Sequence, residues 1–128
     1  MAQALTAGGI VLSFKTDEDL SSSKYRCVLL GTDDLVGITT STTVPATGIT
    51  TADVADGSST AVAVSVQLSG VACAEAGAAV NAGVAVMADT GGKVITCTQG
   101  NIAIGMALEA AGADGDLIPV LIDRYEMS

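Results

Sequence analysis

Residues 60–68, with the sequence TAVAVSVQL, alternate between larger apolar side chains and small or polar ones. Successive side chains of an extended strand point to opposite faces of a sheet. The three valines and Leu68 therefore share one face, while Ser65 and Gln67 lie on the other. This period of two predicts a β-strand with one buried face, and it sets the fold class for the rest of the chain.

Similar runs, separated by turns rich in Gly and Asp, predict seven further strands. Residues 89–92, with the sequence DTGG, join two of these strands as a hairpin, because glycine supplies the positive φ that a short turn needs. The predicted strands cover residues 10–14, 26–30, 35–39, 84–88, 93–98, 101–108 and 117–122.

Three stretches depart from this pattern. Pro119 lies inside the last predicted strand and has no N–H to donate, so we expect that strand at a sheet edge or with a bulge. Residues 74–81 are the one window that suits a helix, of about two turns, with Gly83 just beyond its end. Residues 39–60 contain eleven Ser or Thr and predict a long surface loop, either functional or a floppy insertion.

Together these elements predict an all-β protein, a small β-sandwich or β-barrel with one short helix at most and a long Ser/Thr-rich loop. The 128 residues suffice for one domain of ordinary size. We expect residues 10–128 to form a single β-rich domain, and residues 1–9 could form a flexible N-terminal arm.

The composition indicates a core of small side chains. Apolar residues make up 49% of the chain, but aromatic residues make up 2%, and most of the apolar side chains are Ala and Val. Each of these buries little area, at roughly 25 cal/mol per Å², while ordering a residue costs roughly 1 to 2 kcal/mol. We therefore expect further burial through association with other chains.

Charge and residue content exclude several functions. The net charge of −9 repels phosphate groups and anionic lipid, so we expect neither nucleic acid nor a membrane as partner. The chain has no histidine, which removes Ser-His-Asp and Cys-His catalysis. No catalytic motif is present, and we expect a protein that is not an enzyme and uses no cofactor.

Cysteines and acidic pairs offer no clear site. The three cysteines, Cys27, Cys73 and Cys97, show no metal-ligand or disulfide spacing, so we interpret them as buried small hydrophobic residues. The acidic pairs could coordinate calcium, but none has the spacing of a calcium loop, and Asp is common in turns. We predict no metal site. These pairs lie at residues 17–19, 33–34, 53 and 56, and 114 and 116.

Candidate contact residues come from the few large and cationic side chains. They cluster in three short patches, and Tyr and Arg are favoured at protein interfaces. The alternative is that Phe14 and Tyr25 belong to the core and that the cations offset nearby acids. A face of small residues in the strand at 101–108 invites close approach of another backbone. The predicted capsid or subunit contacts are Phe14, Lys15, Tyr25, Arg26, Ala103, Gly105, Ala107, Arg124 and Tyr125.

An ordered series of short segments resembles the capsid decoration (cement) proteins of tailed bacteriophages. The series begins with the strand that ends at Gly70-Val71 and continues with EAGAAVNAG (residues 75–83), VAVMADTGGKV (84–94), NIAIGMALEAA (101–111) and GDLIPVLI (115–122). The step Ile104-Gly105 followed by ALEAA is the most recognisable element. The resemblance covers about half of the chain; the Ser/Thr-rich stretch at 39–60 is longer than this family leads us to expect.

This resemblance implies a structural virion protein that binds the outer surface of the phage head and stabilises contacts between major capsid subunits. It implies the major capsid protein as partner, a homo-oligomer with a trimer favoured, and synthesis in the host cytoplasm. The alternative from another class is a carbohydrate-binding or host-attachment β-sandwich displayed on the virion. Sugar sites favour Trp and Tyr faces, and this chain has no Trp and two Tyr.

Overall fold

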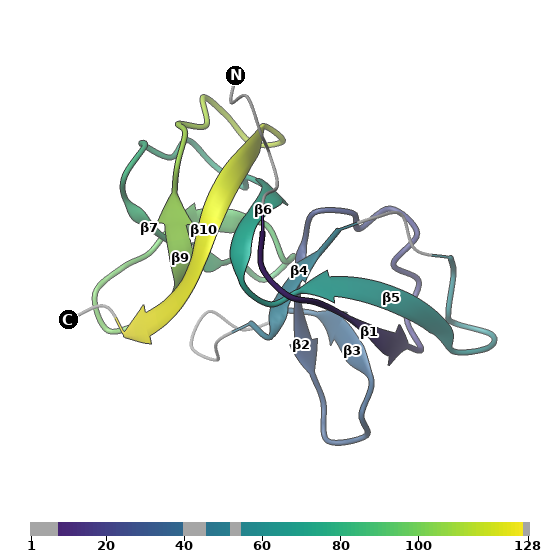
Figure 1. Cartoon of the computed structure of the whole chain (residues 1–128). Helices are drawn as coiled ribbons and strands as arrows, with labels where there is room; N and C mark the ends of the chain where they lie inside the picture. Colours follow the sequence, from purple (N-terminus) through teal and green to yellow (C-terminus); the bar gives the residue numbers. More distant parts are fainter. Residues whose placement is uncertain (1–7, 40–45, 52–54, 127–128) are drawn as a thin grey trace.

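The computed structural model describes residues 8–39, 46–51 and 55–126, with the backbone alone for residues 125 and 126. This part of the chain has ten strands and no helix, so the predicted all-β class is confirmed (Figure 1). It has no helix that is long and apolar enough to cross a membrane. In chain order the strands are β1 (Val11–Thr16), β2 (Cys27–Leu30), β3 (Val36–Ile38), β4 (Gly48–Thr50), β5 (Val62–Gln67), β6 (Gly70–Glu75), β7 (Ala85–Ala88), β8 (Val94–Thr96), β9 (Ile102–Ala107) and β10 (Leu117–Glu126).

The first five strands form an antiparallel sheet with the order β1-β5-β4-β2-β3. Strand β5, predicted from the alternation at residues 60–68, pairs with β1 along its whole length. Val64 and Val66 are buried, while Ala63 and Ser65 are exposed. The predicted faces of this strand are therefore confirmed at its centre.

The last five strands repeat the same order, β6-β10-β9-β7-β8, so that β6 to β10 take the places of β1 to β5. Isolated bridges recur at matching positions: Lys15 pairs in parallel with Leu35, and Ala76 pairs in parallel with Val94. Each bridge brings the two edge strands of its sheet together at one end. Both sheets are therefore curled, and the two lie side by side in Figure 1.

A shared core joins the sheets into a sandwich-like fold. Cys27, Ala46 and Ile49 of the first sheet region are fully or almost fully buried in one cluster with residues of the second sheet. The buried face of β10 contributes Ile118 and Val120 to that cluster. A second cluster, built around Leu20, Val28, Val36, Val64 and Val66, fills the first sheet alone. Most of the buried side chains are Ala and Val, as the composition predicted.

The hairpin predicted at residues 89–92 is confirmed. Strands β7 and β8 pair antiparallel across this turn, and Gly92 has a φ of 83°. The carboxylate of Asp89 accepts hydrogen bonds from the N–H groups of Gly91 and Lys93 at 2.8 and 3.0 Å. This aspartate holds the turn closed, as aspartates commonly do.

The predicted helix at residues 74–81 is wrong. Strand β6 runs through Glu75, and Ala76 and Val80 then form isolated β-bridges. Alanine favours helices over strands as an isolated residue, but here Ala72, Ala74 and Ala76 are fully buried against the shared core. Tertiary packing outweighs the propensity of this segment.

The predicted edge position of Pro119 is also wrong. Strand β10 lies inside its sheet, paired with both β6 and β9. The carbonyl of Pro119 accepts a hydrogen bond from the N–H of Leu108 at 2.9 Å, so its nitrogen also faces the β9 side. Because β9 ends at Ala107, the N–H that Pro119 lacks would lie at the end of the hydrogen-bond ladder between β9 and β10. A bulge does occur in β10, but farther on, between Ile122 and Tyr125.

The predicted long loop at residues 39–60 is partly wrong. Strand β4 lies within it, pairs with β2 and β5, and is buried throughout. The hydroxyl of Thr50 accepts the N–H of Arg26 at 3.0 Å and donates to the carbonyl of Ser23 at 2.7 Å. These hydrogen bonds satisfy the hydroxyl of Thr50, so this polar side chain can be buried in the core. Residues 40–45 and 52–54 of the predicted loop lie outside the described residues.

Candidate contact surface

Arg26, predicted as a contact residue, joins the two sheets of its own chain. Its Nε lies 3.3 Å from Oε1 of Glu75 on β6, and its Nη1 donates to the carbonyl of Gly91 at 3.3 Å. Lys93 binds the other oxygen of Glu75 at 3.3 Å and Asp114 at 2.7 Å. These four side chains form a polar seam across the sheets, so the cation of Arg26 is held in place by its own chain.

Arg124 makes a second connection of this kind. Its Nη1 donates to the carbonyls of Ala46 and Thr47 at 3.0 and 2.6 Å, which ties β10 to the segment before β4. The backbone of Tyr125 pairs with Ala103, and its side chain lies outside the described part. At the predicted patch of Arg124 and Tyr125, the side chain of Arg124 therefore forms hydrogen bonds within its own chain.

The aromatic residues Phe14 and Tyr25 are half-buried. Phe14 packs against the core cluster of the first sheet, while Lys15 beside it is exposed. Tyr25 has a φ of 65°, which is uncommon for a residue with a side chain. The ammonium group of Lys24 lies 5.0 Å from its ring centroid.

The small residues Ala103, Gly105 and Ala107 are buried within the single chain. A Cβ atom on Gly105 would overlap the carbonyl of Leu121 on β10. The strand that approaches this small face closely is therefore β10 of the same chain. A contact of these three residues with another subunit stays a prediction, which their burial does not favour.

Large apolar side chains are also exposed at positions outside the predicted contact residues. On β10 and just after β9, Leu108, Leu117 and Leu121 are 41%, 40% and 38% exposed. They share one face, because Leu121 pairs with Met106 of β9 and Leu108 bonds to Pro119. We call these three residues the outer leucine face. The opposite face of β10 lies in the core. The alternation of residues 117–122 is visible in the sequence, but it does not show which of the two faces stays exposed.

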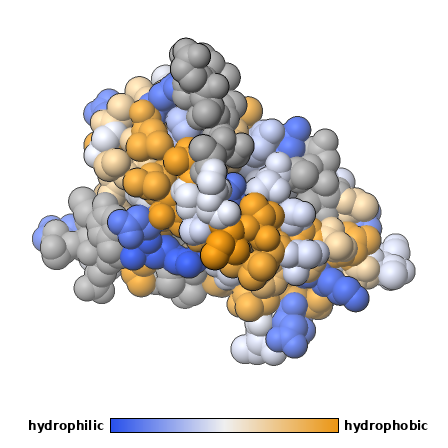
Figure 2. All heavy atoms as spheres, in the orientation of Figure 1, coloured by the Kyte–Doolittle hydropathy of each residue, from blue (hydrophilic) through white to orange (hydrophobic). Residues whose placement is uncertain are grey.

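A second exposed apolar group lies at the start of β1. Ile10, Val11 and Leu12 are 58%, 48% and 48% exposed. In Figure 2 apolar side chains gather over the regions occupied by the start of β1 and by β10. Exposed apolar groups of this kind often mark interaction surfaces.

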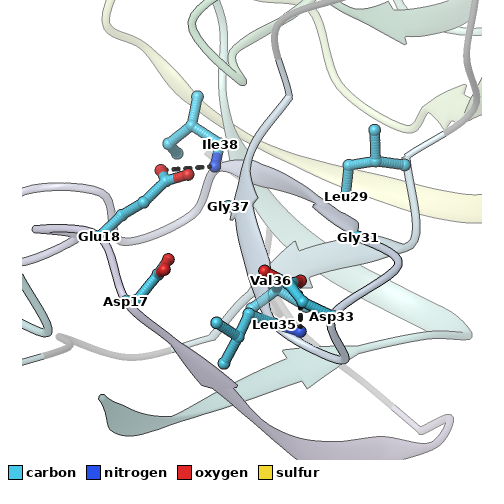
Figure 3. Close-up of a pocket in the computed structure, with 9 residues that line it drawn as sticks. All are labelled: Asp17, Glu18, Leu29, Gly31, Asp33, Leu35, Val36, Gly37 and Ile38. Atoms are coloured by element: carbon cyan, nitrogen blue, oxygen red, sulfur yellow. Dashed lines mark hydrogen bonds between the residues drawn. The ribbon is translucent and has the colours of Figure 1, made fainter. Parts of the chain in front are cut away.

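A hollow of about 280 Å³ lies on the first sheet (Figure 3). Its carboxylates stabilise the surrounding loops: Glu18 accepts the N–H of Ile38 at 3.3 Å and Asp33 accepts the N–H of Leu35 at 3.2 Å. In the described ranges, no group of three or more His, Cys, Asp or Glu is arranged to hold a metal ion. Nothing in this hollow points to a ligand.

The three cysteines are buried and unpaired. Burial raises the pKa of Cys27 to about 12 and that of Cys73 to about 11. Burial also raises the pKa of Cys97. Since the thiolate is the reactive form, these thiols are poor nucleophiles at neutral pH.

Comparison with known proteins identifies the family. No curated protein matches the chain. Among solved structures, the head fiber gp8.5 N base of bacteriophage phi29 is similar, with a TM-score of 0.72 and 19% sequence identity over 93% of this chain and 99% of that one. At this identity the likeness shows the fold. The family model described as phage cement protein matches residues 10–122, so this chain belongs to the phage cement protein family.

Proposed function

We propose that this protein binds the outer surface of a phage head and stabilises contacts between major capsid subunits. The match of residues 10–122 to the phage cement family is the observation that carries the proposal. The net charge of −9 supports an outer position, because an acidic chain is repelled by packaged DNA. On this proposal the chain is made in the host cytoplasm and joins the assembled head.

The outer leucine face is our candidate for the capsid contact. Its three leucines are exposed on one side of β9 and β10, and the other side of β10 is fixed in the core. A rigid strand that presents several apolar side chains loses little conformational freedom on binding. Of the residues predicted from the sequence, exposed Lys15 stays a candidate. Arg26 and Arg124 already bind within the chain.

Stabilisation would follow from mass action. A protein that binds the assembled lattice, and binds its separated subunits less well, adds its binding free energy to the stability of the lattice. Many copies multiply a modest contact. The core of small side chains also favours association between copies, and we propose a homo-oligomer with a trimer as the favoured form.

Cosedimentation with empty phage heads tests the binding. We expect the wild-type chain to pellet with the heads and Leu117→Ser and Leu121→Ser to lower its occupancy at least tenfold. Leu30→Ser is the matched control, because Leu30 is also 40% exposed but lies on the other sheet. Equal occupancy of all four proteins would remove the outer leucine face from the contact, and a wild-type chain that stays in the supernatant would overturn the proposed function.

A further inference from the structure

The first half of β1 is an open sheet edge. The N–H of Leu68 donates to the carbonyl of Ile10 at 2.8 Å, so the even-numbered residues of β1 direct their backbone groups toward β5. The N–H and C=O groups of Val11 and Ser13 consequently point away from the sheet. Strand β3 reaches β1 at Lys15, where the parallel bridge to Leu35 lies, and leaves the first half uncovered.

The other sheet edges carry contacts from within the chain. On β3 the carboxylate of Glu18 accepts the outward N–H of Ile38. On β8 the outward carbonyl of Val94 accepts the N–H of Gly77 at 2.8 Å. The outer edge of β6 is covered as well, where the N–H of Glu75 donates to the carbonyl of Tyr25 at 2.9 Å.

A second hydrogen bond from within the chain satisfies the outer edge of β6 near its start. The side-chain amide of Gln67 donates to the carbonyl of Val71 at 2.9 Å. No comparable contact covers Val11 or Ser13 among the residues that the structure describes. The first half of β1 therefore differs from the three other edges.

The side chains along this edge are uncharged, and most of them are apolar. Ile10, Val11 and Leu12 are about half exposed, on both faces of the strand. No charged residue occurs from Gly8 to Phe14. Proteins usually protect an exposed edge with charges, proline or a bulge, and this edge has none of them. Such an edge suits the addition of another strand.

We propose that this edge of β1 binds the same edge of a second copy of the chain in antiparallel register, with Val11 of each copy opposite Ser13 of the other. Both residues have outward backbone groups, so this register satisfies four of them on each copy. The chain carries a net charge of −9, and copies therefore approach most easily along an uncharged strand. Leu12 of one copy then lies opposite Leu12 of the other, on the two-fold axis.

The contact is small, and this determines where it acts. A stable interface buries about 800 Å² on each partner, whereas this edge offers a short strand and three apolar side chains. The pairing is weak between free copies and effective between copies that another surface already holds close together. A two-fold contact cannot close a trimer, so in a trimer each open edge joins a copy of a neighbouring trimer.

A proline at the open edge tests the pairing. Ser13→Pro removes an outward N–H and leaves the hydrogen bonds to β5 intact. We expect sedimentation velocity over a range of concentrations to show that the oligomers of Ser13→Pro associate with one another at least tenfold more weakly than those of the wild type. Thr96→Pro is the matched control, because the N–H of Thr96 also points outward, from β8. Circular dichroism confirms that both variants fold.

A cysteine on the proposed axis traps the weak complex. Residues opposite each other in a non-hydrogen-bonded antiparallel pair have Cα atoms about 4.5 Å apart, within the range of a disulfide. Under mild oxidation, Leu12→Cys should form a disulfide-linked dimer at least tenfold faster than Ser59→Cys, at an exposed turn. Equal rates, or unchanged association of Ser13→Pro, would overturn the proposal.

Head binding separates this proposal from the proposed function. If Ser13→Pro binds heads as the wild type does but associates less, the edge serves contacts between copies. If the variant associates normally and loses head binding, the edge binds the capsid protein, and the pairing proposed here is wrong. A wild-type chain that never binds heads would overturn the proposed function and leave the pairing result unchanged.

Discussion

Arg26 on one sheet and Glu75 on the other lie 3.3 Å apart, Nε to Oε1, with side chains 24% and 21% exposed. This pair sits directly above the shared core, since the neighbours Cys27 and Ala74 belong to that core. The polar seam and the apolar core therefore hold the two sheets together at the same place.

Arg26→Ala should lower the free energy of unfolding by about 1 to 2 kcal/mol. The change removes the ion pair with Glu75 and the hydrogen bond to Gly91, and it leaves a partly buried carboxylate with one cation fewer. Urea denaturation measures the loss. Lys15→Ala is the control, since Lys15 is exposed on β1, and equal stabilities of the two variants would show that the seam contributes nothing.

The two sheets should unfold in one transition. They share a core cluster that contains Cys27 and Ile49 from one side and Val86 and Ile118 from the other, and such burial couples their stabilities. We therefore expect the probes of the two halves to report the same urea midpoint. Tyrosine fluorescence in a Tyr125→Phe background, which leaves Tyr25 as the emitter, and amide exchange of β9 supply these probes. Two separate midpoints would show that residues 10–128 are not a single folding unit.

Gly105→Ala should lower the free energy of unfolding by about 1 to 3 kcal/mol. The added Cβ would overlap the carbonyl of Leu121, and backbone must move to make room. Gly112→Ala is the control, because its Cβ would meet Asp116 at 3.4 Å, an ordinary contact. A Gly105→Ala protein as stable as this control would show that β9 and β10 are not so closely apposed.

Alkaline pH should destabilise the fold through its buried thiols. Burial raises the pKa of Cys27 to about 12 and that of Cys73 to about 11, from an ordinary value of 9.0. Above pH 9 the unfolded chain loses these protons and the folded chain keeps them, so rising pH favours unfolding. The free energy of unfolding should fall by about 1.4 kcal/mol per pH unit for each thiol.

The slope of unfolding free energy between pH 9 and 10.5 measures this effect. Above that range Lys93 adds a loss of the same sign, because hydrogen bonds to Asp114 and Glu75 raise its pKa above 10.5. Cys27→Ala should make this slope shallower by the contribution of one thiol. This expectation holds whatever the substitution does to the free energy of unfolding at pH 7. An unchanged slope would contradict the burial of Cys27.

Sequence patterns predicted eight of the ten strands. The two missed strands are β4 and β6, and each has a physical reason. Strand β4 is three residues long and begins with Gly48, so it shows no period. Strand β6 is rich in alanine and resembles a helix start, and its burial against the shared core decides its conformation. The repeated strand order depends on long-range pairing and was not visible in the sequence.

The predicted contact residues stay a prediction, and the structure shows which of them already bind within the chain. Most of them were predicted as contacts because they are aromatic or cationic. Of these, Arg26 and Arg124 bind within the chain. Exposure of Leu121 depends on which neighbours cover each face of β10, and this follows from the sheet order. Alternation alone identifies two faces and does not say which one is open.

The thermal rupture of empty phage heads tests the central claim most directly. Heads should release their subunits at a higher temperature when saturated with the wild-type protein, and Leu121→Ser should leave the rupture temperature near that of bare heads at the same concentration. Heads that bind the wild-type protein fully and still rupture at the temperature of bare heads would contradict a stabilising role.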